Sequence, residues 1–200
     1  MKALFFSALV LGALSGSLYG QVQTADVVKD PISGQTFPQQ ISFDRDGKQY
    51  TLEATGATTR KKLVFNVYSI ASYVQKGTPL SGNKAQALVN ADVAKQFTMK
   101  WLRDIEGEKI RGAYLEGYEK NLSPDQLNQL KGNIDKFIGF FSQDVKKGEE
   151  AVIRSFPGGT IEVLINGKSV GTTVNPAFAK ATWNIWLGPN SIVDTAQLVR

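Results

Sequence analysis

Arg60 and Tyr68 are the two residues of this chain whose chemistry and spacing first suggest a site. Arginine keeps its charge at any working pH, and its planar guanidinium presents a fork of donors that suits a carboxylate or an enolate-type oxygen. Tyr68 follows eight residues later in a stretch of β type, and an even separation puts both side chains on one face of an uninterrupted strand. Because eight extended residues span about 26 Å, a direct partnership requires Arg60 to fold back on a turn or loop. The alternative interpretation is that Arg60, Lys61 and Lys62 form a solvated strand entry.

The other polar and aromatic candidates favour structural roles. Arg103 and Asp104 lie at a strand-to-helix junction, where we expect helix capping or an internal ion pair. Tyr114 and Tyr118 are four residues apart on one face of a predicted helix, a spacing typical of core tyrosines with hydrated hydroxyls. Both tryptophans near the C-terminus, Trp183 and Trp186, are expected to anchor the core.

The composition excludes several kinds of chemistry. The 200 residues include no Cys and no His, which removes disulfides, thiol nucleophiles, the usual zinc sites and histidine-dependent triads. Glycine-rich nucleotide motifs and the paired carboxylates of glycosidases are missing too, so the sequence predicts no cofactor and no metal. The formal charge of +5 is spread along the chain without a basic block, which argues against nucleic acid as a partner.

Length and composition indicate one soluble domain behind an export signal. In residues 1–20, Lys2 is followed by an apolar run to about Ala13 and then by small residues, the pattern of a secretory signal peptide, so we expect a periplasmic or secreted protein. The apolar run is shorter than the roughly 20 residues of a bilayer span, which predicts no stable membrane span after signal removal. Residues 21–36 lack a sustained period and are expected to form an extended N-terminal arm, and residues 37–200 the folded domain.

Hydrophobic periodicity predicts the order β-β-β, helix, β, helix, helix, β-β-β, helix for the folded domain. Strands are expected at 41–43, 49–52, 61–74, 96–102, 151–156, 160–165 and 168–172. Helices are expected within 80–94, over 106–121, and after the caps Ser123 and Asn175, each of which precedes a proline. Tight hairpins between the strands favour an antiparallel sheet with helices on one side, an α+β domain. On the strand at 61–74, one face is expected to carry Lys62, Val64, Asn66, Tyr68 and Ile70.

Three stretches of the chain resemble the chalcone isomerase-like proteins, in particular their secreted bacterial branch. They are GATTR before FNVYSIASYV, then FTMKWLRDIEGEKIRGAYLEGYEKNLS, and FAKATWNIWLG near the C-terminus. The resemblance covers about residues 37 to 199. It implies an open-faced β-sandwich, in which a large antiparallel sheet carries a helical layer on one side and a cleft lies between the two.

The resemblance also implies what the cleft could do. The family includes plant isomerases, which close chalcones into flavanones by intramolecular oxa-Michael addition, and non-catalytic relatives, some of which bind fatty acids in the same cleft. In the isomerases an arginine, a threonine, a tyrosine and an asparagine frame the reacting oxygens. Arg60 matches the arginine, and alignment on SIASYV puts the threonine's place at about Tyr68. The places of the tyrosine and the asparagine fall near Ile110 and Gly117, so both polar groups are lost.

These departures favour a binding protein over an enzyme, because apolar Ile110 and bare Gly117 cannot orient a phenolate beside a bound water. We expect a fatty acid or similar amphiphilic carboxylate, whose tail gains about 0.8 kcal/mol per buried methylene and whose head Arg60 anchors. The expected ligand-binding residues are Arg60, Tyr68, Asn66, Ile110 and Tyr114, and the expected cleft lining is Val64, Ile70, Ile110, Tyr114, Phe137 and Trp186.

Two alternatives stay open. The first is an isomerase (intramolecular lyase) acting on an unknown substrate, which needs a polar residue such as Tyr68, Asn66 or Tyr114 within reach of Arg60. The second is a scaffold that binds a protein partner and has a closed cleft. Neither the protein partner nor the oligomeric state follows from the sequence.

Overall fold

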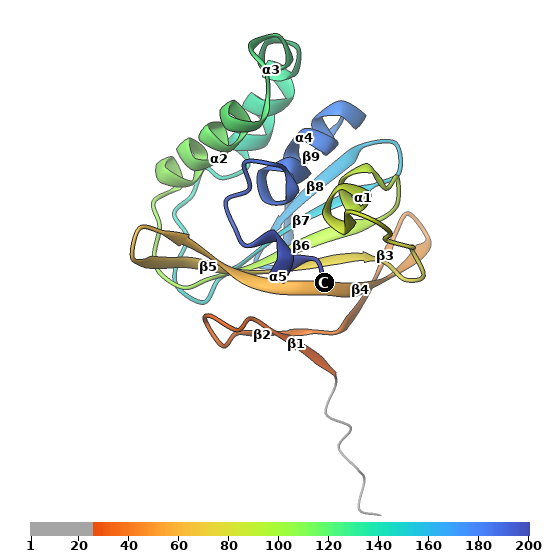
Figure 1. Cartoon of the computed structure of the whole chain (residues 1–200). Helices are drawn as coiled ribbons and strands as arrows, with labels where there is room; N and C mark the ends of the chain where they lie inside the picture. The colour runs from red at the N-terminus through yellow and green to blue at the C-terminus, as the bar shows by residue number, and fades with distance from the viewer. Residues whose placement is uncertain (1–25) are drawn as a thin grey trace, which may run out of the picture.

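The structure, a computed structural model, describes residues 26–200 and is built around a seven-stranded antiparallel sheet. Every strand of this sheet pairs with the next one in sequence, and the sheet is curled (Figure 1). The strands are β3 (Gln40–Arg45), β4 (Lys48–Lys62), β5 (Phe65–Gln75), β6 (Lys95–Trp101), β7 (Glu150–Phe156), β8 (Thr160–Ile165) and β9 (Lys168–Val174). The predicted antiparallel α+β architecture is therefore confirmed.

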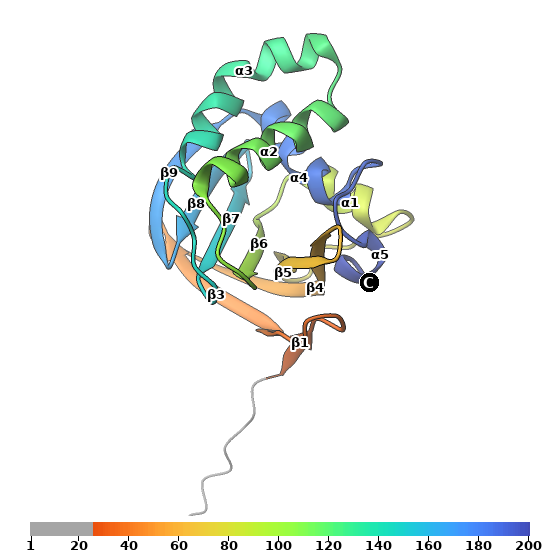
Figure 2. The same ribbon diagram turned by 90° about the vertical axis from the view of Figure 1, so that its left-hand side faces the viewer.

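The main helices cover one face of the sheet, as the views in Figures 1 and 2 show. The helices are α1 (Lys84–Asn90), α2 (Gly107–Asn121), α3 (Pro124–Gly139), α4 (Pro176–Leu187) and α5 (Thr195–Leu198). Both predicted caps are present: Ser123 forms a capping box with Gln126, and the Asn175 side chain accepts from the backbone N–H groups of the next turn. Within residues 26–200, no helix combines the length and the apolar character that crossing a membrane requires.

The core lies between the helices and the sheet. Phe97, Met99 and Trp101 of β6 all point into it, as the alternation in the sequence predicts. Trp183 stacks on Phe97 with ring centroids 4.9 Å apart, and Trp186 is equally buried, so both C-terminal tryptophans are core anchors.

A short hairpin of β1 (Val27–Lys29) and β2 (Thr36–Pro38) covers the opposite face of the sheet (Figure 1). It includes part of the predicted N-terminal arm, whereas the predicted signal peptide of residues 1–20 lies outside the described residues. The hairpin is fixed by Asp30, which is 0% exposed and accepts hydrogen bonds from the hydroxyls of Thr59 and Ser69 on β4 and β5. Burial raises the pKa of Asp30, but hydrogen bonds from Ser33, these two hydroxyls and a backbone N–H more than offset it, so the pKa lies below its usual value.

The strand predicted at 61–74 begins too early, because the chain reverses its direction at residues 63–64. β4 runs on to Lys62, Leu63 and Val64 form a two-residue turn, and β5 begins at Phe65. The turn contains no Gly, Pro or Asn, so the sequence offered no signal for it. This hairpin brings Arg60 and Tyr68 opposite each other as Cα partners, which is the fold-back that their partnership requires.

A register shift in the same hairpin decides which side chains face the helices. Arg60 pairs with Tyr68 but Lys61 pairs with Asn66, which leaves Val67 as an extra residue in β5. The alternation of side chains reverses across this bulge, so Phe65 lies on the face of Tyr68 and Asn66 on the other. The predicted shared face of Asn66 and Tyr68 is therefore wrong.

Candidate functional site

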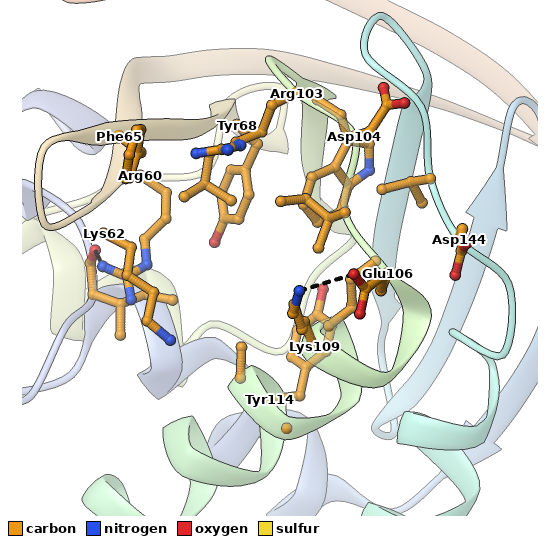
Figure 3. Close-up of a pocket in the computed structure, with 18 of the residues that line it drawn as sticks. Arg60, Lys62, Phe65, Tyr68, Arg103, Asp104, Glu106, Lys109, Tyr114 and Asp144 are labelled. Atoms are coloured by element: carbon orange, nitrogen blue, oxygen red, sulfur yellow. Dashed lines mark hydrogen bonds and ion pairs between the residues drawn. The ribbon is translucent and has the colours of Figure 1, made fainter.

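A cavity of about 780 Å³ lies between the β4–β5 hairpin and helix α2 (Figure 3). Its volume is within the range of about 300–1,000 Å³ that small-molecule sites occupy. Its buried lining residues are Tyr68, Trp101, Ile110, Tyr114 and Val145. Half-buried and exposed apolar or small residues complete the wall: Leu63, Phe65, Val67, Ile105, Gly112, Ala113 and Ile192. The charged residues of the lining are Arg60, Lys62, Arg103, Asp104, Glu106, Lys109, Glu116, Asp144 and Lys146.

Arg60 is held at the edge of this cavity by the backbone. Its Nη1 donates to the carbonyl oxygen of Ile192, 3.1 Å away in the segment after α4, and to that of Lys61. These bonds use part of a guanidinium that carries five N–H donors, so donors remain for a ligand. The guanidinium is thus positioned before any ligand arrives.

Tyr68 faces Arg60 across the hairpin and contributes a neutral phenol (Figure 3). Its hydroxyl accepts a hydrogen bond of 2.9 Å from Nε1 of Trp186. Burial raises the pKa of Tyr68 to about 12, although the Trp186 bond and the charge of Arg60 both act to lower it. The phenol therefore stays protonated at neutral pH and can donate its own O–H to a ligand oxygen.

Helix α2 forms the opposite wall with Ile110 and Tyr114, one turn apart on its inner face. The Tyr114 ring packs against Phe141 with centroids 4.6 Å apart, and burial raises the pKa of its hydroxyl well above the usual value. The position that the family resemblance gives to an asparagine is occupied by Gly117, which lies outside the cavity lining. A Cβ at Gly117 would lie 3.1 Å from Cγ2 of Ile185, so this glycine serves the close packing of α2 against α4.

Two of the four acidic groups of the lining form ion pairs with lysines of the same lining. Glu106 pairs with Lys109 at 2.9 Å, and Asp104 pairs with Lys146 at 3.4 Å while also accepting from the backbone N–H of Lys147. Asp104 thus forms an ion pair, but both side chains are more than half exposed, so it is a surface pair and not the internal one expected. Capping of α2 is provided by Asp144 instead, which accepts from the backbone N–H of Gly107 at 3.0 Å.

Three cations of the lining form no ion pair within residues 26–200: Arg60, Lys62 and Arg103. Arg103 lies over the ring of Phe65, 4.5 Å from its centroid. Glu116 pairs with Lys120 at 2.5 Å, and this pair lowers the pKa of its carboxyl group. The charges of Lys62 and Arg60 are close enough to lower that pKa further. The mouth of the cavity therefore has an excess of positive charge and suits an anionic group.

The structure brings together four of the five predicted site residues. Arg60, Tyr68, Ile110 and Tyr114 all line the cavity, whereas Asn66 is exposed on the hairpin and does not. Of the other predicted lining residues, Val64 is exposed in the turn, and the remaining three lie in the core behind the cavity wall: Ile70, Phe137 and Trp186.

Sequence reasoning missed the lining residues that come from turns and loops. Phe65 is brought in by the bulge, and Ile105, Val145 and Ile192 lie outside regular elements. Trp101 is the last residue of β6, a strand that periodicity identified, and its alternation indicated that Trp101 faces the helices. Arg103 follows the strand, so the alternation gave no signal for it. Nothing in the sequence marks the others as neighbours.

A curled antiparallel sheet with a helical layer on one side and a cavity between the two defines the chalcone isomerase-like fold. The family model for chalcone isomerase-like proteins matches residues 29–196, and the chain belongs to that family. Among solved structures, the fold is similar to that of a fatty-acid binding protein of Arabidopsis thaliana. The TM-score is 0.68 and the sequence identity 16%, over 86% of this chain and 94% of that one. No curated protein matches the chain in sequence.

Proposed function

We propose that the protein binds a fatty acid or similar amphiphilic carboxylate in the cavity and does not transform it chemically. The observation that carries this proposal is the combination of a buried apolar lining with Arg60 fixed at the mouth, free of any ion pair within residues 26–200. The likeness of the fold to a fatty-acid binding protein supports the same class of ligand.

The apolar lining supplies affinity for the tail. Each methylene transferred from water to the cavity contributes about 0.8 kcal/mol, so a long acyl chain gains more than a short one until the cavity is filled. The head supplies orientation. Arg60 and the Tyr68 hydroxyl are cross-strand neighbours, and both can donate to one carboxylate.

The buried side chains of the cavity wall opposite Arg60 favour binding without catalysis. Ile110 offers no polar atom there, and the phenols of Tyr68 and Tyr114 both have raised pKa values, so neither is a useful base at neutral pH. We expect no cyclisation of chalcones above the uncatalysed rate. Turnover that disappears in Arg60→Ala would favour the isomerase alternative instead.

The binding experiment compares Arg60→Ala with Lys61→Ala. Lys61 is the next residue and carries the same charge, but it is exposed and does not line the cavity. Losing a hydrogen-bonded charge pair costs about 1.5–3 kcal/mol, so titration with palmitate should show a Kd raised on the order of tenfold to a hundredfold in Arg60→Ala. Lys61→Ala should bind as the parent protein does.

Three further measurements accompany this comparison. Arg60→Lys keeps the charge without the planar fork and should give an intermediate Kd. Thermal unfolding must show that each variant is folded, because Arg60 also holds the Ile192 segment. Native mass spectrometry of protein from its own host should show a co-purifying acid that is missing in Arg60→Ala. An empty protein that also fails to bind palmitate would overturn the proposal in favour of a scaffold.

We also propose that the protein acts outside the cytoplasm, in the periplasm or after secretion, as a member of a secreted bacterial branch of the family. The support is the signal-peptide pattern of residues 1–20 together with a chain free of cysteine, which has no thiol to protect or pair after export. N-terminal sequencing of the exported protein should find a start between Ser17 and Ala25. A full-length chain confined to the cytoplasm would contradict this proposal.

A further inference from the structure

The tip of the β4–β5 hairpin, residues 63–65, is a run of three large apolar side chains in water. Leu63 is 89% exposed, Val64 86% and Phe65 52%. The other large apolar residues that are exposed within 26–200 are scattered along the chain: Val27, Ile32, Leu115, Val170 and Val174. Isolated exposed apolar residues are common on protein surfaces, but a contiguous cluster marks a surface that binds something.

The backbone of the tip strengthens this interpretation. Leu63 has a φ of 55°, in the left-handed region that a bulky side chain rarely adopts. The other two-residue hairpin turns of the chain place Asp46–Gly47 and Asn166–Gly167 at such angles, as turn chemistry favours. A leucine at this position weakens the turn and buries nothing in the fold. Its apolar side chain is therefore suited to a contact outside the protein.

The charges around the tip indicate which contact. Lys61 and Lys62 directly precede it, and the Arg103 guanidinium lies over the Phe65 ring. Neither lysine forms an ion pair within the described part of the chain. Apolar side chains that enter the acyl boundary, flanked by cations that reach lipid phosphates, are the features that bind a peripheral protein to an anionic bilayer.

We infer that residues 63–65 insert into the surface of an anionic lipid bilayer. Leu63 and Phe65 also line the cavity, and Figure 3 shows Phe65 and Lys62 on the hairpin beside it. Docking through the tip therefore turns the cavity mouth toward the lipid. An amphiphile then passes between membrane and cavity with little exposure of its tail to water; this last step rests on the proposed function, whereas the docking does not.

The absence of cysteine from the chain allows a local test. Val64→Cys, labelled with an environment-sensitive fluorophore, is mixed with phosphatidylcholine–phosphatidylglycerol vesicles and with vesicles of phosphatidylcholine alone. Val174→Cys is the matched control, because Val174 is an exposed valine at the end of edge strand β9. The label reports only its own surroundings, so adsorption of the chain through another segment leaves its emission unchanged.

We expect a blue shift and increased emission at position 64 with the anionic vesicles and none at position 174. An unchanged emission at position 64, an equal change at both positions, or an equal change with neutral vesicles would each overturn the inference. In the Val64→Cys background, Leu63→Gly should weaken vesicle binding on the order of tenfold, because it removes one inserted leucine side chain. Lys61→Glu should weaken it by at least about fivefold.

The vesicle assay contains no fatty acid, and the palmitate titration contains no vesicles. Loss of the vesicle response therefore tests only the docking surface, and loss of palmitate binding tests only the cavity. Circular dichroism of Leu63→Gly should match the parent protein, because glycine tolerates the φ of that position. A parent-like vesicle response from folded Leu63→Gly would also overturn the inference.

Discussion

Tyr68 connects the cavity to the core through a single hydrogen bond. Replacing it with phenylalanine leaves Nε1 of Trp186 buried without its acceptor. An unsatisfied buried donor costs about 1–3 kcal/mol, so the free energy of unfolding of Tyr68→Phe should fall by that amount. Urea unfolding followed by tryptophan fluorescence measures it. Tyr50→Phe is the control, since its hydroxyl forms no hydrogen bond within residues 26–200, and an equal loss in both variants would contradict the prediction.

Asp30 should make stability depend on pH in the acid range. Its pKa is lowered in the folded protein, so its contribution is complete above the ordinary value of 3.8 and is lost as the pH falls through the folded value. Asp30→Asn should be less stable than the parent at pH 7 by at least about 2 kcal/mol, because the hydroxyl donors lose a charged acceptor.

The difference between Asp30→Asn and the parent should shrink as the pH falls from the ordinary value of 3.8 toward the lower pKa of folded Asp30, because the unfolded parent then binds a proton that the folded parent does not. Urea unfolding at a series of pH values tests this expectation. Asp44→Asn, at an exposed position of β3, should follow the pH profile of the parent. A constant difference between Asp30→Asn and the parent from pH 7 to the acid range would show that the carboxylate charge is not responsible.

Arg60 is a site residue that the chemistry of its side chain and the family resemblance together could predict. Its charge, its donors and the resemblance of GATTR to the family were enough to select it, and the structure places it at the cavity. Asn66 was selected by strict alternation, which fails at the bulge. Whether a residue faces the helices depends on strand register, and register is set by pairing between strands that the sequence of one strand does not contain.

At the scale of elements, the turn at Leu63 and Val64 should respond unequally to glycine. Leu63→Gly relieves a strained φ, and the free energy of unfolding should rise by about 0.5–1 kcal/mol. Val64 is not among the residues with positive φ, so Val64→Gly should lower stability by a similar amount through the entropy of the unfolded chain. Denaturant titration gives the free energy of unfolding of both variants. A Val64→Gly variant more stable than Leu63→Gly would show that the backbone at Leu63 is not strained.

Helix α2 offers a second matched pair in Gly112 and Gly117. A Cβ at Gly112 meets open space, so Gly112→Ala should gain about 0.5–1 kcal/mol of helix propensity. At Gly117 the added methyl crowds Ile185 of α4, and crowding in a packed interface costs about 1–3 kcal/mol. Gly117→Ala should therefore be less stable than Gly112→Ala by at least about 1 kcal/mol. Equal gains in chemical denaturation would show that α2 and α4 have room to separate.

The elements themselves were largely predictable from the sequence. The order of the seven strands and of α1 to α4 follows the predicted order, because alternation, 3.6-residue periodicity and the proline-marked caps are local signals. The misses are elements without such signals. β1 and β2 are three residues each and stay folded by docking on the sheet, and the four-residue α5 is too short to show a period. The turn at 63–64 lacks every residue that normally announces one.

At the scale of the whole molecule, the cavity should bind longer acyl chains more tightly. Each methylene adds about 0.8 kcal/mol, so affinity should rise by up to about fourfold per carbon from laurate through myristate and palmitate. The gain ends when the chain outgrows the cavity. Calorimetric titration gives the affinities, and the melting temperature should rise with free ligand by mass action. An affinity that does not change with chain length would mean that the tail stays in water.

The resemblance implied a cleft between sheet and helices, but the set of residues that lines its mouth could not be derived from the sequence. Its charged mouth combines residues from the β4–β5 hairpin, the segment after β6, helix α2 and the segment before β7, and its edge is closed by Ile192 near the C-terminus. Each of these segments appears ordinary by itself. Their meeting depends on the curl of the sheet and on how far α2 stands from it, which are properties of the assembled layers.

The extra residue in β5 has a consequence for how relatives of this protein diverge. Val67 is the residue of β5 that has no partner on β4, so its loss would leave Arg60 opposite Tyr68 and Lys61 opposite Asn66 in an unbroken ladder. Lys62 and Phe65 would still face the cavity and Lys61 and Asn66 the opposite side, whereas the Val67 side chain would be lost from the cavity wall. Loss of a single codon is thus enough to enlarge the cavity entrance by one apolar side chain while every other residue of the hairpin keeps its face.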